Sequence, residues 1–211
     1  MNRLAILGAS GHGKVVADAA LAAGWTDVAF FDDRWPQLRE IGPWSVLGTT
    51  AELTRAHGDF DGVVIAIGDN RTRLLKQRAF AGEGLAFVSI VHPAAMVSRY
   101  AHIGAGSVVL AGAVVNAFTL IGIASIVNTG ATIDHDGILA DGVHLSPGAH
   151  VGGGVRMGEC AWIGVGAAVR HGISIGANAI VGAGAAVVRD VAANLVVVGV
   201  PARPLHTNKA T

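Results

Sequence analysis

The sequence predicts a chain of two parts, an α/β domain with a Rossmann-like sheet followed by an all-β parallel β-helix. From Val97 to Val187, every sixth residue is Val, Ile, Leu or Met, without a miss over sixteen positions. Helices repeat at 3.6 residues and ordinary strands at two, so a period of six is typical of a β-helix, in which each hexad forms one strand and one corner. Residues 1–92 instead alternate short apolar runs with helical patterns. We therefore expect a Rossmann-like sheet domain over 1–92 and a β-helix with a closing segment over 93–211.

The N-terminal part begins as a β-α-β unit. An apolar run at 4–7 predicts a buried strand, the turn GASGHG leads into a helix, and the run at 28–31 predicts a second strand. Further strands are expected at 63–67 and 86–90, with a helix between them. The first helix is expected to carry Val15, Val16, Ala19 and Ala20 on one face, and the second contains Leu74, Leu75, Arg78 and Ala79.

In the β-helix, three hexads make one triangular coil of eighteen residues. Residues eighteen apart therefore stack at the ~4.8 Å spacing of neighbouring strands. Four residues after the repeated aliphatic position, twelve of the sixteen hexads have Ala, Ser, Thr or Gly, which lets the faces pack closely. One residue after it, ten hexads have Gly, Asn or Asp, to which we assign the left-handed backbone of the corners.

Composition limits the classes of partner. Of the 211 residues, 52% are hydrophobic and 14% charged, which indicates a large buried core. Lys plus Arg and Asp plus Glu are balanced at fifteen each, so neither nucleic acid nor a membrane is an expected partner. No signal-peptide pattern opens the chain, and we expect a cytoplasmic protein. Cys160 is the single cysteine, which excludes an internal disulfide and fits a packing role.

The turn after the first expected strand carries three glycines, Gly8, Gly11 and Gly13, in the spacing GxxGxG. Backbone N–H groups at the start of a helix can approach an anion closely, so this turn is a candidate phosphate site. A tight packing turn is an equally good explanation of the glycines alone. Asp32 and Asp33 favour the binding site, because acids at the end of the second strand accept hydrogen bonds from sugar hydroxyls.

A third loop, Gly68-Asp69-Asn70, follows another strand and is expected at the same edge of the sheet. A dinucleotide cofactor is the rival ligand for this edge. The predicted sheet is about half of what a dinucleotide needs, which favours one nucleotide with a pendant group.

Polar residues gather in one coil of the otherwise apolar repeat. Asp134, His135 and Asp136 share a corner, with Asn128 before them and His144 after them. A histidine beside carboxylates is held in one tautomer and made more basic, which suits a general base near neutral pH. A solvated polar corner is the alternative.

A zinc site is a second alternative, because γ-class carbonic anhydrases share the β-helix and place histidines on neighbouring coils. His171 lies two coils above His135, with Gly153 between them. The zinc pattern also requires a histidine five residues after the later one, and this chain has Gly176 there. We therefore expect no metal.

Six segments together resemble the nucleotide-sugar amino N-acetyltransferases of the hexapeptide-repeat, left-handed β-helix acyltransferase family. They are GASGHGKVVADAA, FFDD, IGDNRTR, VNTGATIDHD, HLSPGAHVGG and the terminal GVPAR. The resemblance spans nearly the whole chain. It implies a homotrimer with the nucleotide-sugar on the N-terminal domain and acetyl-CoA along the β-helix between neighbouring subunits.

The resemblance also implies roles by position. His135 would be the base and Asp136 the acid that raises its basicity, although relatives carry Glu there. Asn128 would approach the thioester sulfur. Acetyl-CoA would further contact His144 and the backbone at Val165 and Ala183. The nucleotide-sugar would be held by Ser10, Gly11, His12, Asp32 and Asp33, with Gly68 and Asn70 at the same edge.

The function implied is acetyl transfer from acetyl-CoA to the 4-amino group of a nucleotide-linked amino-deoxy sugar, with UDP favoured over GDP by FFDD. The reaction would be direct, without a covalent enzyme intermediate, and would serve bacterial glycan or glycoprotein biosynthesis. O-acetylation of a sialic-acid-type sugar is one alternative. A non-catalytic scaffold that binds nucleotide-sugars is another.

Overall fold

The computed structural model describes residues 2–80 and 82–205. Its N-terminal sheet has the strand order β3-β4-β2-β1-β5, and all neighbours run parallel except β3 and β4. Side chains alternate across it: Leu4 and Ile6 face one side, and Ala5 and Leu7 the other. The strands are β1 (Arg3–Leu7), β2 (Asp27–Phe31), β3 (Glu40–Ile41), β4 (Trp44–Gly48) and β5 (Gly62–Ile65), and the helices are α1 (Gly11–Ala22), α2 (Thr50–Ala56), the 3₁₀ turn η1 (His57–Asp59) and α3 (Asn70–Ala79).

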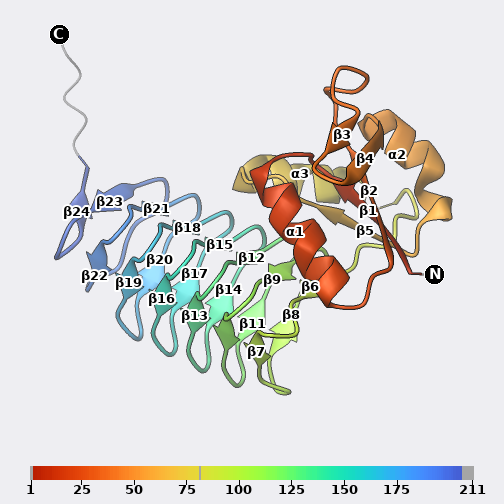
Figure 1. The fold of residues 1–211 in the computed structure, drawn as a ribbon. Helices are drawn as coiled ribbons and strands as arrows, with labels where there is room; N and C mark the ends of the chain where they lie inside the picture. The colour runs from red at the N-terminus through yellow and green to blue at the C-terminus, as the bar shows by residue number, and fades with distance from the viewer. Residues whose placement is uncertain (1, 81, 206–211) are drawn as a thin grey trace, which may run out of the picture.

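Helix α1 lies between this sheet and the β-helix (Figure 1). One continuous apolar cluster joins α1 and the sheet to Val108, Leu110 and Ile126 of the β-helix. Val16, Ala19 and Ala20 are buried as predicted, whereas Val15 is exposed. The opposite side of the sheet packs on Leu53 of α2. The two parts of the chain therefore share a core.

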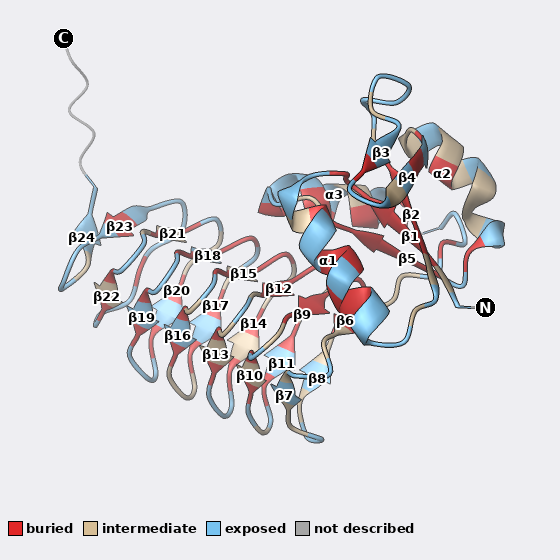
Figure 2. Cartoon of the chain, viewed as in Figure 1, coloured by how far each residue is buried: buried red, intermediate tan, exposed pale blue. Residues whose placement is uncertain are grey.

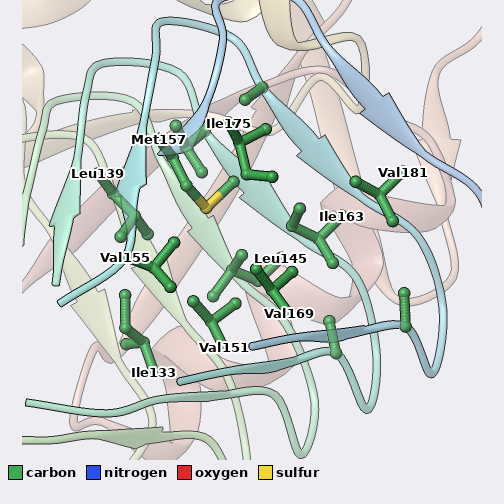
Figure 3. Packing of buried hydrophobic residues seen from close by; sticks show 14 of the residues in the cluster. Ile133, Leu139, Leu145, Val151, Val155, Met157, Ile163, Val169, Ile175 and Val181 are labelled. Atoms are coloured by element: carbon green, nitrogen blue, oxygen red, sulfur yellow. The ribbon is translucent and has the colours of Figure 1, made fainter. Parts of the chain in front are cut away.

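The second part is a parallel β-helix with three faces, and the predicted architecture is confirmed. Each strand pairs with the strand eighteen residues away, as Ile133 does with Val151. The repeated aliphatics point inward and pack on one another (Figure 3). We name each face after one of its strands, and the β12 face consists of β6 (Ile90–Val91), β9 (Val108–Val109), β12 (Ile126–Val127), β15 (His144–Leu145), β18 (Trp162–Ile163), β21 (Ile180–Val181), β23 (Val196–Val198) and β24 (Arg203–Pro204). The β13 face consists of β7 (Met96–Val97), β10 (Val114–Val115), β13 (Thr132–Ile133), β16 (His150–Val151), β19 (Ala168–Val169) and β22 (Ala186–Val187). The β14 face consists of β8 (His102–Ile103), β11 (Leu120–Ile121), β14 (Ile138–Leu139), β17 (Arg156–Met157) and β20 (Ser174–Ile175).

The three corners are numbered in chain order. Corner 1 leads from the β12 face to the β13 face and includes 128–131, 146–149, 164–167 and 182–185. Corner 2 leads on to the β14 face and includes 98–101, 116–119, 134–137 and 152–155. Corner 3 returns to the β12 face and includes 104–107, 122–125, 140–143 and 158–161.

The sequence analysis placed the corner residue with the left-handed backbone two positions too early. Positive φ angles occur at the third residue after the repeated aliphatic, as in Gly142 and Gly154, and not at the first. Glycines at the first position serve close approach instead. A Cβ on Gly104 would lie 2.5 Å from the carbonyl carbon of Gly122 in the next coil, so a side chain has no room there.

The start of the β-helix also differs from the prediction. The strand expected at 86–90 is reduced to a single bridge between Val63 and Phe87. Ile90 begins β6, which pairs with β9 of the β-helix, so the coils begin before residue 93. Beyond Val187 the chain still follows the coil, with β23 parallel to β21 and β24 folding back on β23.

Helix α3 docks on corner 3 through polar side chains. Its buried face includes Asn70, Arg73 and Gln77, whereas the apolar side chain of Leu75 is 57% exposed. Each polar side chain donates to a corner carbonyl on a successive coil. The bonds run from Gln77 to Ala105 (2.8 Å), from Arg73 to Ala124 (2.7 Å) and Gly142 (3.0 Å), and from Asn70 to Cys160 (3.2 Å).

Arg73 is 1% exposed and has no carboxylate partner. Its guanidinium also donates to the carbonyl of Ile67 at 2.8 Å and to Asn70 Oδ1 at 2.9 Å. Burial lowers the pKa of Arg73 to about 10, so it stays charged at neutral pH. A buried charge is tolerated when it is fully hydrogen-bonded, and here backbone carbonyls of both domains supply the bonds. Figure 2 shows the strands of the N-terminal sheet as largely buried.

No helix among the described residues is long and apolar enough to cross a bilayer.

Candidate active site

The Asp134-His135-Asp136 corner forms an ordered acid and base pair on corner 2. His135 Nδ1 lies 2.7 Å from Asp136 Oδ2, and the His135 backbone N–H donates to Asp134 Oδ1 at 2.9 Å. Asn116, one coil below, donates to the same Asp134 oxygen at 3.0 Å. The carboxylate of Asp136 therefore fixes the proton on Nδ1 and leaves the Nε2 lone pair of His135 available.

The imidazole of His135 rests over Gly153 of the next coil. A Cβ at Gly153 would lie 2.7 Å from Nε2, so any side chain there would displace the ring. The hydrogen bond to Asp136, followed by the charge of Asp134, raises the pKa of His135 above its ordinary value. The side chain is 63% exposed and can reach a substrate.

A second group lies where the β12 face meets corner 1. The Asn128 side-chain oxygen accepts from the Thr129 backbone N–H at 2.8 Å, which directs its amide nitrogen to His144 Nε2, 3.3 Å away. The His144 ring stacks on Trp162 with centroids 5.8 Å apart and planes 5° apart. The bond from Asn128 requires His144 to accept at Nε2, so its proton resides on Nδ1.

His144 is a poor base in this setting. Burial, helped by the charge of Arg73, lowers its pKa to about 3, so the ring is neutral at physiological pH. Its Nδ1 is buried and has no hydrogen-bond partner within the described residues. The group suits donation of a hydrogen bond better than removal of a proton.

Val165 and Ala183 are exposed at corner 1, directly along the β-helix from Asn128. The carbonyl of Val165 accepts from the Gly184 N–H at 2.8 Å. Val165 and Ala183 therefore lie on one line parallel to the β-helix axis, and Asn128 lies one residue before the equivalent position of its own coil. His135 belongs to a different corner, so one chain does not bring the base to the Asn128 group.

The sheet edge next to the Gly-rich turn encloses a pocket of about 230 Å³. Ser10 begins α1 without a side-chain capping bond, and the free N–H groups of the first turn lie beside it. The pocket is lined by Leu7, Gly8, Ser10, Asp32, Asp33, Ile67, Gly68 and Lys76. The predicted loops after β1, β2 and β5 do meet there.

The two aspartates of the pocket are held differently. Asp32 accepts from the Ala9 N–H at 2.8 Å and pairs with Arg34 at 2.8 Å; the Arg34 hydrogen bond is the main cause that lowers the pKa of Asp32 to about 2. Asp33 accepts from the Thr50 N–H at 2.8 Å, and its other oxygen is 3.4 Å from Lys76 Nζ. Asp32 thus shapes the turn, while Asp33 stays more open.

The sequence reasoning missed Lys76, which lines the pocket, and Arg34, which pairs with the pocket residue Asp32. Lys76 brings a cation to the pocket from the second turn of α3, where it also donates to Thr50 Oγ1 at 3.1 Å. The sequence could have indicated Lys76 by its position, six residues after Asn70 on the same helix. Arg34 follows Asp32 by two residues, the spacing of a local side-chain turn.

The glycines of the pocket separate into two kinds. A Cβ at Gly8 or Gly13 would lie 2.8 Å or 2.2 Å from a backbone oxygen, so packing alone demands glycine at both. A Cβ at Gly11 or Gly68 would meet no atom within 4 Å. Packing does not explain the latter two, and the open space above them is available to a ligand.

Other predicted site residues serve the junction between the domains. The Asn70 side chain is committed to Cys160 and Arg73. Asp69 caps α3 by accepting from the Thr72 N–H at 2.8 Å. His12 Nε2 is buried without a partner in the described part of the chain, and burial lowers the pKa of His12 to about 4.

Among residues 2–80 and 82–205, no three His, Cys, Asp or Glu side chains gather as a metal ion requires. His171 is exposed two coils above His135, with Gly153 between them.

Comparison with known proteins relates both parts of the chain to sugar-modifying enzymes. Residues 3–79 match the family described as the PglD N-terminal domain. UDP-N-acetylbacillosamine N-acetyltransferase from Bacillus subtilis (strain 168) is 39% identical over 115 residues, covering 53% of this chain and 52% of that protein. The chain thus matches about half the length of this curated relative.

Two solved structures match over almost the full length. The acetyltransferase domain of PglB from Neisseria gonorrhoeae FA1090, in complex with acetyl coenzyme A, has a TM-score of 0.93 and 42% identity, covering 97% of this chain and 99% of that one. PerB from Caulobacter crescentus, in complex with CoA and GDP-perosamine, has a TM-score of 0.90 and 39% identity, covering 96% and 97%.

Proposed function

Because this chain belongs to the PglD-like family of nucleotide-sugar N-acetyltransferases, we propose that it acetylates the 4-amino group of a UDP-linked amino-deoxy sugar in glycan or glycoprotein biosynthesis. The enzyme class, an acetyltransferase, and the acetyl donor, acetyl-CoA, come with the family. The observation that carries the mechanism is the His135–Asp136 pair, which presents a free Nε2 on a rigid corner.

The chemistry follows from this pair. The neutral sugar amine attacks the thioester carbonyl carbon, and His135 Nε2 removes the proton that the amine loses. Asp136 stabilises the resulting imidazolium through Nδ1–H. The carbon–sulfur bond then breaks, and the CoA thiolate takes up a proton. General-base help of this kind contributes roughly 10² to 10⁴ in rate.

Acetyl-CoA is assigned to the line of corner 1, with Asn128 near the sulfur, His144 beside it, and the backbone at Val165 and Ala183 further along. Corner 1 and the base on corner 2 are separate within one chain, so the proposal requires two chains to complete a site. A homotrimer meets this need, because every β-helix then presents corner 1 to a neighbour's corner 2.

Sedimentation tests the assembly. We expect a species of three chains of 21.3 kDa each. A monomer with full activity would contradict the shared site.

The decisive experiment is release of CoA thiol from acetyl-CoA with a panel of UDP- and GDP-linked amino sugars and matched hydroxyl sugars. Turnover with a UDP-linked 4-amino sugar is expected. Turnover with hydroxyl acceptors alone would assign O-acetylation, and tight nucleotide binding without any turnover would favour a scaffold.

The nucleotide site is tested separately by calorimetry. The proposed contacts are Ser10, Gly11, Asp32, Asp33 and Gly68, whereas His12 and Asn70, expected here from the sequence, lie at the junction between the domains. Gly11→Ala is the cleanest probe, since its Cβ meets no atom of the chain. UDP should bind the wild type and bind this variant more weakly. Gly58→Ala, equally unhindered but in η1, is the control. Binding of NAD as tight as that of UDP would overturn the assignment.

A further inference from the structure

Two exposed aromatic rings stand on the corner that carries the proposed base. Tyr100 and Phe118 are each 61% exposed, and their rings stack with centroids 5.5 Å apart and planes 27° apart. Tyr100, Phe118 and Asp136 follow one another at intervals of eighteen residues, so they occupy the same place in successive coils. The Arg99 guanidinium lies 5.8 Å from the Tyr100 ring centroid.

Phe118 is strained and gains no burial from it. Its φ of 61° is in the left-handed region, where most coils of the β-helix have glycine. The other residues with positive φ in the described chain are glycine, Ala, Asn, Asp or Cys, so Phe118 is the single aromatic among them. Bulky residues avoid this region, and such strain is concentrated at functional sites. Neither packing nor backbone preference explains a phenylalanine here.

The Phe118 corner is firmly joined to the His135 corner above it. The backbone N–H of Asp136 donates to the Ala117 carbonyl at 3.1 Å, and Thr119 Oγ1 donates to the Asp134 carbonyl at 2.9 Å. With the bond from Asn116 to Asp134, three hydrogen bonds fix the rings relative to the base.

We propose that Tyr100 and Phe118 form a stacking platform that binds the acceptor sugar and selects it, while its amine faces His135. The platform rests on the proposed function. A pyranose presents one face of C–H groups, to which a deoxy carbon adds further apolar surface, and aromatic rings bind such surfaces in ligand sites. An amino sugar also arrives partly protonated, and an aromatic face attracts a cation. A fully hydroxylated sugar without an amine has less apolar surface for the rings and no cation, so the platform should bind it more weakly.

The test is steady-state kinetics of Phe118→Gly and Tyr100→Ala with the best acceptor of the panel. Each should raise the acceptor KM about 3- to 10-fold, in line with the loss of one aromatic stack. The KM of acetyl-CoA should not change. Phe118→Gly should also keep or raise the melting temperature, because glycine relieves the strained backbone. Leu120→Ala, an exposed apolar residue on β11 of the same coil, is the control.

An unchanged acceptor KM in both variants would refute the platform while the proposed function stood. A lower melting temperature with loss of the oligomer in Phe118→Gly would refute it in favour of a subunit contact. If the wild type turned over no amino sugar, the proposed function would fail first and the platform with it.

Discussion

Corners 2 and 3 are built from the same hexapeptide, yet one is left open and the other is covered by a helix. Corner 2 presents His135 and Asp136 to solvent, where both are more than 60% exposed. Corner 3 directs its carbonyls into α3, where Arg73 satisfies two of them. The comparison shows that the same coil backbone can carry either exposed site residues or a docking surface for a helix. What covers a corner decides whether its residues serve chemistry or docking.

The largest effect is expected from removing the base of corner 2. His135→Ala should reduce kcat by roughly 10² to 10⁴, because general-base help is lost. Its melting temperature should be unchanged, since the side chain packs little. Rate and thermal unfolding are measured on the same preparation. Retention of more than about a tenth of kcat would move the base elsewhere.

Asp136→Asn should reduce kcat less than His135→Ala does. The amide still fills the space, but it no longer stabilises the imidazolium, so the loss of kcat should be smaller than in His135→Ala. His171→Ala, two coils above on the same corner, should leave kcat near the wild-type value. An equal loss in His171→Ala would mean that the corner as a whole is sensitive.

Corner 3 should show the opposite pattern. Arg73→Leu leaves buried carbonyls without donors and should lower the free energy of unfolding by about 3–5 kcal/mol. Denaturant titration measures it. Arg78→Ala is the matched control on the same helix, because its ion pairs with Asp141 and Glu159 are exposed and worth about 0–1 kcal/mol. Equal losses in the two variants would contradict the docking role of Arg73.

The pH dependence should separate activity from stability. The pKa of His135 is raised, so the acid limb of kcat/KM should lie above 6.5, because the base must be neutral. The pKa values of His12 and His144 are lowered to about 4 and about 3. Between pH 6.5 and 4 the unfolded chain therefore binds more protons than the folded one, and stability falls as the pH drops.

The slope of that loss is at most about 1.4 kcal/mol per pH unit for each histidine. Unfolding measured between pH 7.5 and 4.5 tests it, and His12→Gln should flatten the curve. Asp32, with its pKa lowered to about 2, adds a loss only below pH 3.8. Stability that did not change from pH 7 to 5 would contradict the buried neutral histidines.

The period of six predicted the coil and its stacking, because apolar burial repeats locally. It also placed His135 beside Asp136, since neighbours in sequence share a corner. The pattern did not distinguish the two uses of glycine: close approach to the next coil and a positive φ both demand the same residue. Asn128 and His135 share a coil in sequence, yet the six-residue phase puts them at different corners.

A local sequence pattern could not predict how α3 docks on the β-helix. Its buried face is mostly polar and Leu75 is exposed, so apolar periodicity does not reveal which side of the helix is buried. Asn70, Arg73 and Gln77 are buried because carbonyls 28 to 90 residues away lie within their reach. That match depends on coil spacing, which no short window of sequence contains.

The bonds of α3 to main-chain carbonyls end at Cys160, and three strands of the β12 face, β18, β21 and β23, follow before the chain turns back at β24. Among the described residues, no hydrogen bond or ion pair joins α3 to a residue beyond Cys160. Insertion or deletion of a whole eighteen-residue coil past Cys160 would therefore lengthen or shorten the stack while the first domain kept its seat. The number of coils after Cys160, and with it the length of the corner 1 line assigned to acetyl-CoA, can therefore change in evolution while the N-terminal domain keeps its position on the β-helix.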